Sequence, residues 1–103
     1  MKQHQYQITV EHLYDQQGNP SSYSDKLEFQ TRNHDDIFAI IQKLQTANLL
    51  DEQATQSFAV GLKLFSETLL ENRDIPLFKE FMPQFVQFMK QLKQHIPKPA
   101  ETV

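Results

Sequence analysis

The hydrophobic pattern of this chain changes its period near Arg32. Over residues 4–14 and again over residues 26–31, apolar and polar side chains alternate, which is typical of half-buried strands. Leu27 and Phe29 are predicted to point inward on the second of these strands. After Arg32 the apolar residues recur every 3.6 positions, as on one side of an amphipathic helix. The change of period predicts an α+β fold, in which an antiparallel β-hairpin is followed by three main α-helices.

The helix boundaries follow from capping residues and prolines. The first helix is predicted over about residues 35–47, with Asn48 closing it in a left-handed conformation. Asp51 caps a second helix that runs to about residue 71. The last helical region, residues 77–96, is predicted to be interrupted near Pro83, because proline lacks the N–H that a helix interior needs and fits best in a first turn.

Length and charge exclude several classes of protein. With 103 residues, the sequence predicts one domain over residues 1–96 and a disordered C-terminal tail over 97–103. A net charge of -3 argues against nucleic-acid binding and against a membrane-surface helix, since both need a concentrated basic face. The chain has no cysteine, and neither a signal peptide nor a membrane span is recognisable, so a cytoplasmic location is expected.

The sequence offers no strong motif for catalysis, cofactors or metals. No two histidines are spaced as helical metal ligands, and the two glycines belong to no phosphate-binding loop. Glu67 and Glu71 lie one helical turn apart, and a solvated acidic edge is favoured over an ion site. We therefore predict no cofactor and no metal, and we favour a non-enzymatic protein, although general acid–base chemistry needs too few residues to be excluded.

The segment RNHDDIF contains the best catalytic candidates, His34 and Asp35. It lies where a strand gives way to a helix, a common place for sites. A capping interpretation is favoured: Asn33 would accept N–H bonds from the first turn, and Asp35 and Asp36 would place negative charge at the positive end of the helix dipole. His34 is the member that capping does not require.

Two surfaces could join this chain to another. Ser57 and Gly61 belong to a strip of small residues on the second helix, for which packing inside the core is favoured over an intermolecular seam. A two-stranded sheet also leaves two open edges, and the first strand, with Gln5, Gln7 and Thr9, carries little charge to prevent pairing. These features predict a homodimer, or an added partner peptide at the edge.

The segments HDDIFAII, FAVGLKLFSETLL and NRDIPLF, together with the strand YQITV, resemble a small bacterial family known as a domain of unknown function. The resemblance covers about residues 6–93. It implies a bacterial cytosolic origin and the domain limits given above, and it transfers no catalytic or binding residue.

The function expected from these observations is that of a protein-interaction or accessory domain that self-associates. The alternative is a small-ligand-binding protein or a minor enzyme, with a pocket between the hairpin and the last helix and with His34 at its mouth.

Overall fold

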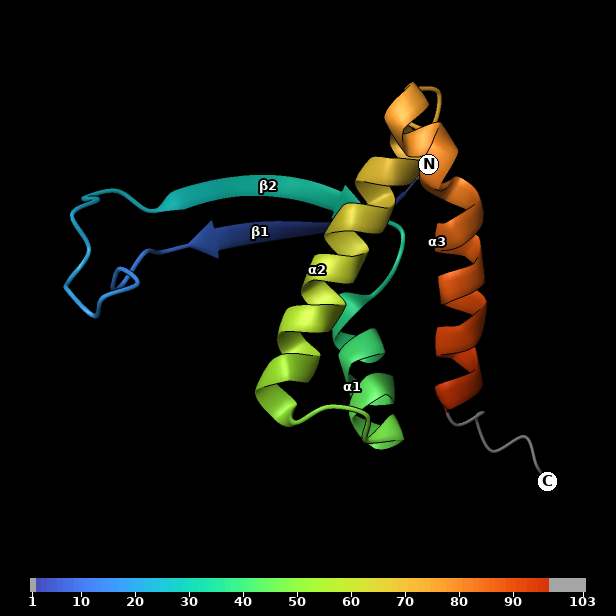
Figure 1. Ribbon diagram of the computed structural model, residues 1–103, viewed down its shortest axis with the longest axis horizontal. Coiled ribbons are helices and arrows are strands. Elements are labelled where there is room, and N and C mark those ends of the chain that lie inside the picture. Colours follow the sequence, from blue (N-terminus) through green and yellow to red (C-terminus); the bar gives the residue numbers. More distant parts are fainter. Residues whose placement is uncertain (1, 97–103) are drawn as a thin grey trace. The chain divides into compact units, whose positions relative to one another are not determined.

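The computed structural model describes residues 2–96 and shows an α+β fold, with a two-stranded antiparallel hairpin followed by three helices (Figure 1). The chain divides into a hairpin unit that ends at His34 and a helical unit that begins at Asp35. The tail predicted to be disordered lies outside the described residues. Within residues 2–96, none of the helices is both long and apolar enough to cross a lipid bilayer.

The hairpin pairs β1 (His4–Val10) with β2 (Leu27–Asn33) over seven residues each. Ile8 lies opposite Phe29, and Val10 lies opposite Leu27, so the apolar side chains of both strands share one face. The first strand is shorter than predicted, because the chain leaves the ladder after Val10 and makes only an isolated bridge further on. Leu27 and Phe29 do share the apolar face, but both are exposed, so the prediction that they point into a core is wrong.

The loop between the strands is ordered by Asp15. Its carboxylate accepts the N–H groups of Gln17 and Asn19, both at 2.9 Å, while its own N–H donates to the Asn19 carbonyl at 2.8 Å. Gly18 has φ 90°, a backbone conformation that residues with a Cβ rarely adopt. Its N–H donates to the Asp15 carbonyl at 3.0 Å. These bonds close residues 15–19 into a compact turn.

Helix α1 (Ile37–Ala47) begins later than predicted. Its N-cap is Asp36, whose side chain accepts the N–H of Ala39 at 3.2 Å, and not Asn33. Asn33 ends β2 and is buried. At the other end Asn48 has φ 58° and ψ 37°, which confirms the predicted left-handed cap.

Helix α2 (Glu52–Glu71) is capped by Asp51, which accepts the N–H of Ala54 at 2.8 Å as predicted. Helix α3 (Pro76–His95) starts with a proline in its first turn and continues through Pro83. The predicted interruption there is therefore wrong.

Two observations explain why the helix tolerates this proline. Pro83 and Lys79, whose carbonyl loses its partner, are both exposed residues, so the proline lies on a solvent-exposed side of the helix. In the orientation that satisfies its neighbours, the Gln84 amide also donates to the carbonyls of Glu80 and Phe81 at 3.1 and 3.2 Å.

The core of the helical unit takes one buried side chain from each helix: Leu44 of α1, Ala59 of α2 and Leu92 of α3. Partly buried apolar residues surround it: Ile40, Ile41, Phe58, Leu62, Met89 and Ile96. Aromatic rings add contacts between α2 and α3, with ring centroids 6.3 Å apart for Phe58 and Phe88. Phenylalanine side chains of α3 thus pack in part against α2.

Candidate functional site

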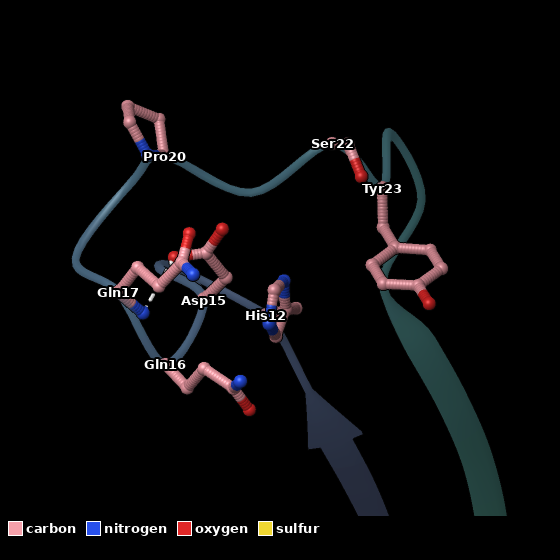
Figure 2. Close-up of a pocket in the computed structure, with 7 residues that line it drawn as sticks. All are labelled: His12, Asp15, Gln16, Gln17, Pro20, Ser22 and Tyr23. Atoms are coloured by element: carbon pink, nitrogen blue, oxygen red, sulfur yellow. Dashed lines mark hydrogen bonds between the residues drawn. The ribbon is translucent and has the colours of Figure 1, made fainter.

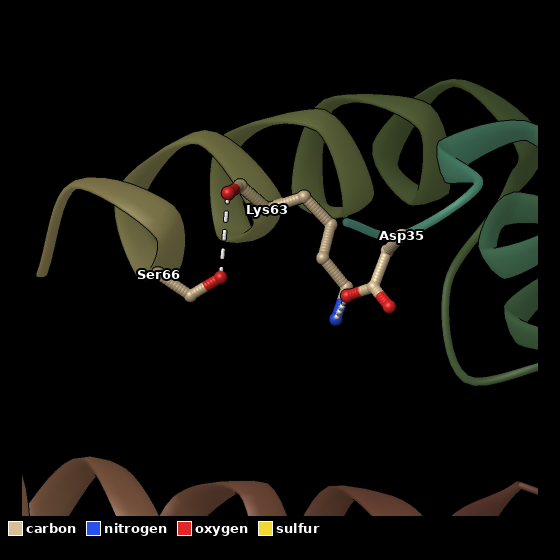
Figure 3. Close-up of polar contacts among 3 residues, drawn as sticks. All are labelled: Asp35, Lys63 and Ser66. Carbon is tan, nitrogen blue, oxygen red and sulfur yellow. Dashed lines mark hydrogen bonds and ion pairs between the residues drawn. The ribbon is translucent and has the colours of Figure 1, made fainter. Parts of the chain in front are cut away.

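The segment His34-Asp35-Asp36 does not assemble into one site, because the two aspartates have separate structural roles. Asp36 caps α1, and Asp35 forms an ion pair with Lys63 of α2, with 2.9 Å between Oδ2 and Nζ (Figure 3). His34 is exposed. A capping role for this segment is confirmed, but the cap is Asp36 and not the predicted Asn33, while the ion pair of Asp35 with Lys63 was not predicted.

The ion pair is largely removed from water, with the Lys63 side chain 11% exposed and that of Asp35 30% exposed. Three other polar residues are also buried on α2: Thr55, Ser66 and Glu67. The Ser66 hydroxyl donates to the Lys63 carbonyl at 3.3 Å. The ion pair links the residue before the cap of α1 to the middle of α2, and its partial burial carries a cost in desolvation.

Glu67 is buried, while Glu71 is exposed. The predicted solvated acidic edge is therefore wrong at Glu67. Among residues 2–96, His, Asp and Glu side chains nowhere gather in a group of three or more that could hold a metal ion.

The strip of small residues on α2 does not pack inside the helical unit. Ser57 and Gly61 are exposed, and a Cβ added at Gly61 would meet no atom within 4 Å. The favoured prediction, close internal packing at Gly61, is wrong. A seam with another chain at this strip stays a prediction.

A hollow of about 460 Å³ lies at the loop end of the hairpin, where the sequence analysis identified no candidate site (Figure 2). It is lined by His12, Asp15, Gln16, Gln17, Pro20, Ser22 and Tyr23. The His12 and Tyr23 rings meet edge to face, with centroids 5.3 Å apart. Nδ1 of His12 also lies within hydrogen-bond distance of the Ser21 hydroxyl, which accepts the N–H of Tyr23 at 3.0 Å.

His12 and Ser21 have the residue types of a catalytic base and a nucleophile. Their hydrogen bonds stabilise the loop instead. A catalytic serine needs a histidine that a third group orients. The carboxylate that lines the hollow, that of Asp15, accepts N–H bonds within its own turn. The Asn19 N–H is the main cause that lowers the pKa of Asp15 below its usual value, since it stabilises the charged form.

His34 lines a second, smaller hollow of about 260 Å³, together with Lys2, Gln3 and His4. This hollow is open, and all of its lining residues belong to the hairpin unit. The predicted pocket between the hairpin and the last helix stays a prediction, as does the role of His34 within it.

The two faces of the hairpin differ sharply in chemistry. Gln5, Gln7 and Thr9 are exposed on the polar face, where Thr9 lies opposite Glu28 and Gln5 lies opposite Arg32. On the other face, and in the adjoining loop, large apolar side chains are exposed. We call this set the apolar hairpin surface: Val10, Leu13, Tyr14, Tyr23, Leu27 and Phe29. An exposed set of this kind marks an interaction site more often than a catalytic one.

Comparison with known proteins places the chain in a family that has been defined without a function. Residues 4–94 match a family described as a domain of unknown function with a solved structure, DUF3861. The chain belongs to this family. The crystal structure of a protein of unknown function from Pectobacterium atrosepticum is similar, with a TM-score of 0.77 and 39% sequence identity over 90% of this chain and 99% of that one. A search of functionally curated proteins finds no match.

Proposed function

We propose that this DUF3861 protein is a non-enzymatic interaction domain of the bacterial cytoplasm that self-associates through its hairpin unit. The observation that supports this proposal is that the hairpin, within the described residues, is left with an exposed apolar face. It is a sheet of only two strands, and its apolar side chains remain exposed toward the loop end. A two-stranded sheet is marginal in water unless its apolar face packs against something.

The chemistry of the other surfaces agrees with an interaction role. The two aspartates of RNHDDIF cap a helix and pair with Lys63, while Asp15 orders a loop. These are structural uses of the residues that a catalyst would need. The bacterial origin rests on the relative from Pectobacterium atrosepticum.

The experiment is a concentration series of the purified protein by sedimentation equilibrium and native mass spectrometry. We expect a dimer that dissociates on dilution, since interfaces of modest size give micromolar to nanomolar affinities. A mass of 12.1 kDa at every concentration up to about 100 μM, well above a typical micromolar dissociation constant, would contradict the proposal.

A second candidate function, binding of a small anion, is favoured by the hollow beside His34. Lys2 supplies a cation, and His4 and His34 supply imidazole donors. Titration with inorganic phosphate, followed through the histidine ring signals by NMR, tests it. Saturable shifts at His4 and His34 that a Lys2→Met variant abolishes would support anion binding, and unchanged spectra at 10 mM phosphate, far above a typical ligand affinity, would exclude it.

A further inference from the structure

We infer that the partner of the apolar hairpin surface is a second copy of this chain, and that the two copies pack face to face through this surface and not edge to edge. The inference deepens the proposed function and rests on it. It begins from Val10, Leu27 and Phe29, which lie on one face of the hairpin and are 54%, 59% and 41% exposed. Apolar side chains that stay this exposed in adjacent positions form a continuous patch.

The patch extends beyond the strands into the ordered loop. Tyr23 is 73% exposed, and its ring contacts the edge of His12, the residue two positions beyond Val10. Leu13 and Tyr14 follow at once and are 61% and 64% exposed, but successive residues of an extended chain point to opposite sides, so only one of the two can continue the patch. Because the Asp15 turn and the Ser21 hydroxyl hold this loop by hydrogen bonds, the surface is formed before a partner arrives.

The exposed area suits a dimer of ordinary size. With about 200 Å² for a whole aromatic side chain, the rings of Phe29 and Tyr23 leave roughly 230 Å² exposed. Val10 and Leu27, at about 100 Å² for each whole side chain, and one of Leu13 and Tyr14 bring the apolar total to roughly 400–470 Å². Interfaces are slightly more than half apolar, so such a patch corresponds to about 700–800 Å² per partner. A stable complex buries about 800 Å² per partner.

Edge pairing alone would not cover this patch. If two hairpins joined into one four-stranded sheet, their apolar faces would lie side by side, and the exposed apolar area would double. Face-to-face packing of two sheets, about 10 Å apart, buries both faces at once. The preference for face-to-face contact therefore follows from the burial of apolar area.

Charge is compatible with a second copy as the partner. The four cross-strand pairs of this face, from His4 and Asn33 to Val10 and Leu27, contain no Lys, Arg, Asp or Glu. The charges of the hairpin ladder, Glu28 and Arg32, lie on the opposite face. A two-fold axis brings each surface against itself, and an uncharged face meets no like-charge repulsion in that arrangement.

The test replaces the cross-strand pair Val10 and Leu27 with threonine, which keeps a high strand propensity. Two copies lose four apolar side chains from the interface, so we expect V10T/L27T to raise the dimer dissociation constant roughly 100-fold. The matched control, Q7T/Q30T, alters a cross-strand pair on the polar face and should leave the constant within about threefold. Circular dichroism checks folding, and L27T alone, with an expected effect of about tenfold, replaces the double variant if that variant unfolds.

The outcomes separate the inference from the proposed function. A wild-type protein that stays monomeric overturns both. If the wild-type protein dimerises and the dissociation constants of V10T/L27T and Q7T/Q30T are the same, face-to-face packing is overturned. Self-association through another surface then remains. A selective loss in V10T/L27T supports the inference.

Discussion

Replacing Asp35 with asparagine should destabilise the helical unit more than replacing its partner does. The carboxylate of Asp35 lies 2.9 Å from Nζ of Lys63, and the two side chains are unequally buried. In D35N the lysine, 11% exposed, keeps the cost of its desolvation but loses the carboxylate. In K63M the carboxylate, 30% exposed, can regain water, and the methionine keeps most of the apolar stem of Lys63.

The magnitude follows from the burial of the pair. Breaking a fully buried ion pair costs about 3–5 kcal/mol, and an exposed pair is worth less than about 1 kcal/mol. This pair lies between those limits, so we expect D35N to lower the free energy of unfolding by about 2–3 kcal/mol and K63M by about 1 kcal/mol. For a chain of this size the larger loss corresponds to a fall in Tm of roughly 10–20 °C.

The assay is urea denaturation of wild type, D35N, K63M and the double variant, followed by helical circular dichroism. The double variant should lose less than the two single losses added together, with a coupling energy of about 1–2 kcal/mol. K43M removes an exposed lysine from α1 and should change stability by less than about 0.5 kcal/mol. A coupling energy below about 0.5 kcal/mol, or a larger loss in K63M than in D35N, would refute the reasoning from burial.

Three further predictions concern local features. D36A and D51A each remove a helix cap and should cost about 1 kcal/mol in urea denaturation; asparagine at either position should cost much less, and equal losses for alanine and asparagine would contradict the capping role. G61A should stabilise the protein by about 0.5–1 kcal/mol, because a Cβ at this exposed helical position meets nothing within 4 Å, and a loss of stability would show a contact there. The pKa of Asp15, followed by carboxyl NMR, should lie below its usual value of 3.8. Because the pKa of Asp15 is lower in the folded than in the unfolded chain, its contribution to stability is present above pH 3.8 and is lost as the pH falls through the folded pKa. A pKa at or above 3.8 by NMR would contradict the hydrogen bonds of the Asp15 turn.

Local rules predicted the elements of this fold well. The change of hydrophobic period located the hairpin and the helices, and the caps Asn48 and Asp51 occupy the predicted ends. Each of these features depends on the chemistry of a few adjacent residues, which a sequence states directly. Pro83 did not follow its local rule, because an exposed helix face tolerates a missing N–H and the true first-turn proline is Pro76.

The candidate site was harder to predict because it depends on contacts between distant residues. No pattern in the sequence around Asp35 indicates that Lys63, 28 positions further along the chain, is its partner. Gly61 has the residue type of a close packing position, but only the placement of the other helices shows that the space beside it is open. Alternation correctly gave the apolar face of the hairpin, while the exposure of Leu27 on that face could not be read from the pattern.

The Asp15 turn has a further consequence for how fast the chain folds. His4 pairs with Asn33 across a long stretch of chain, whereas most helical hydrogen bonds join residues four apart, so the hairpin has the higher contact order. Closing a long flexible loop carries an entropic cost that grows with its length. A turn that already folds residues 15–19 on themselves shortens the flexible chain to be closed. We therefore expect the helices to form first and the Asp15 turn to set the rate at which β1 and β2 meet.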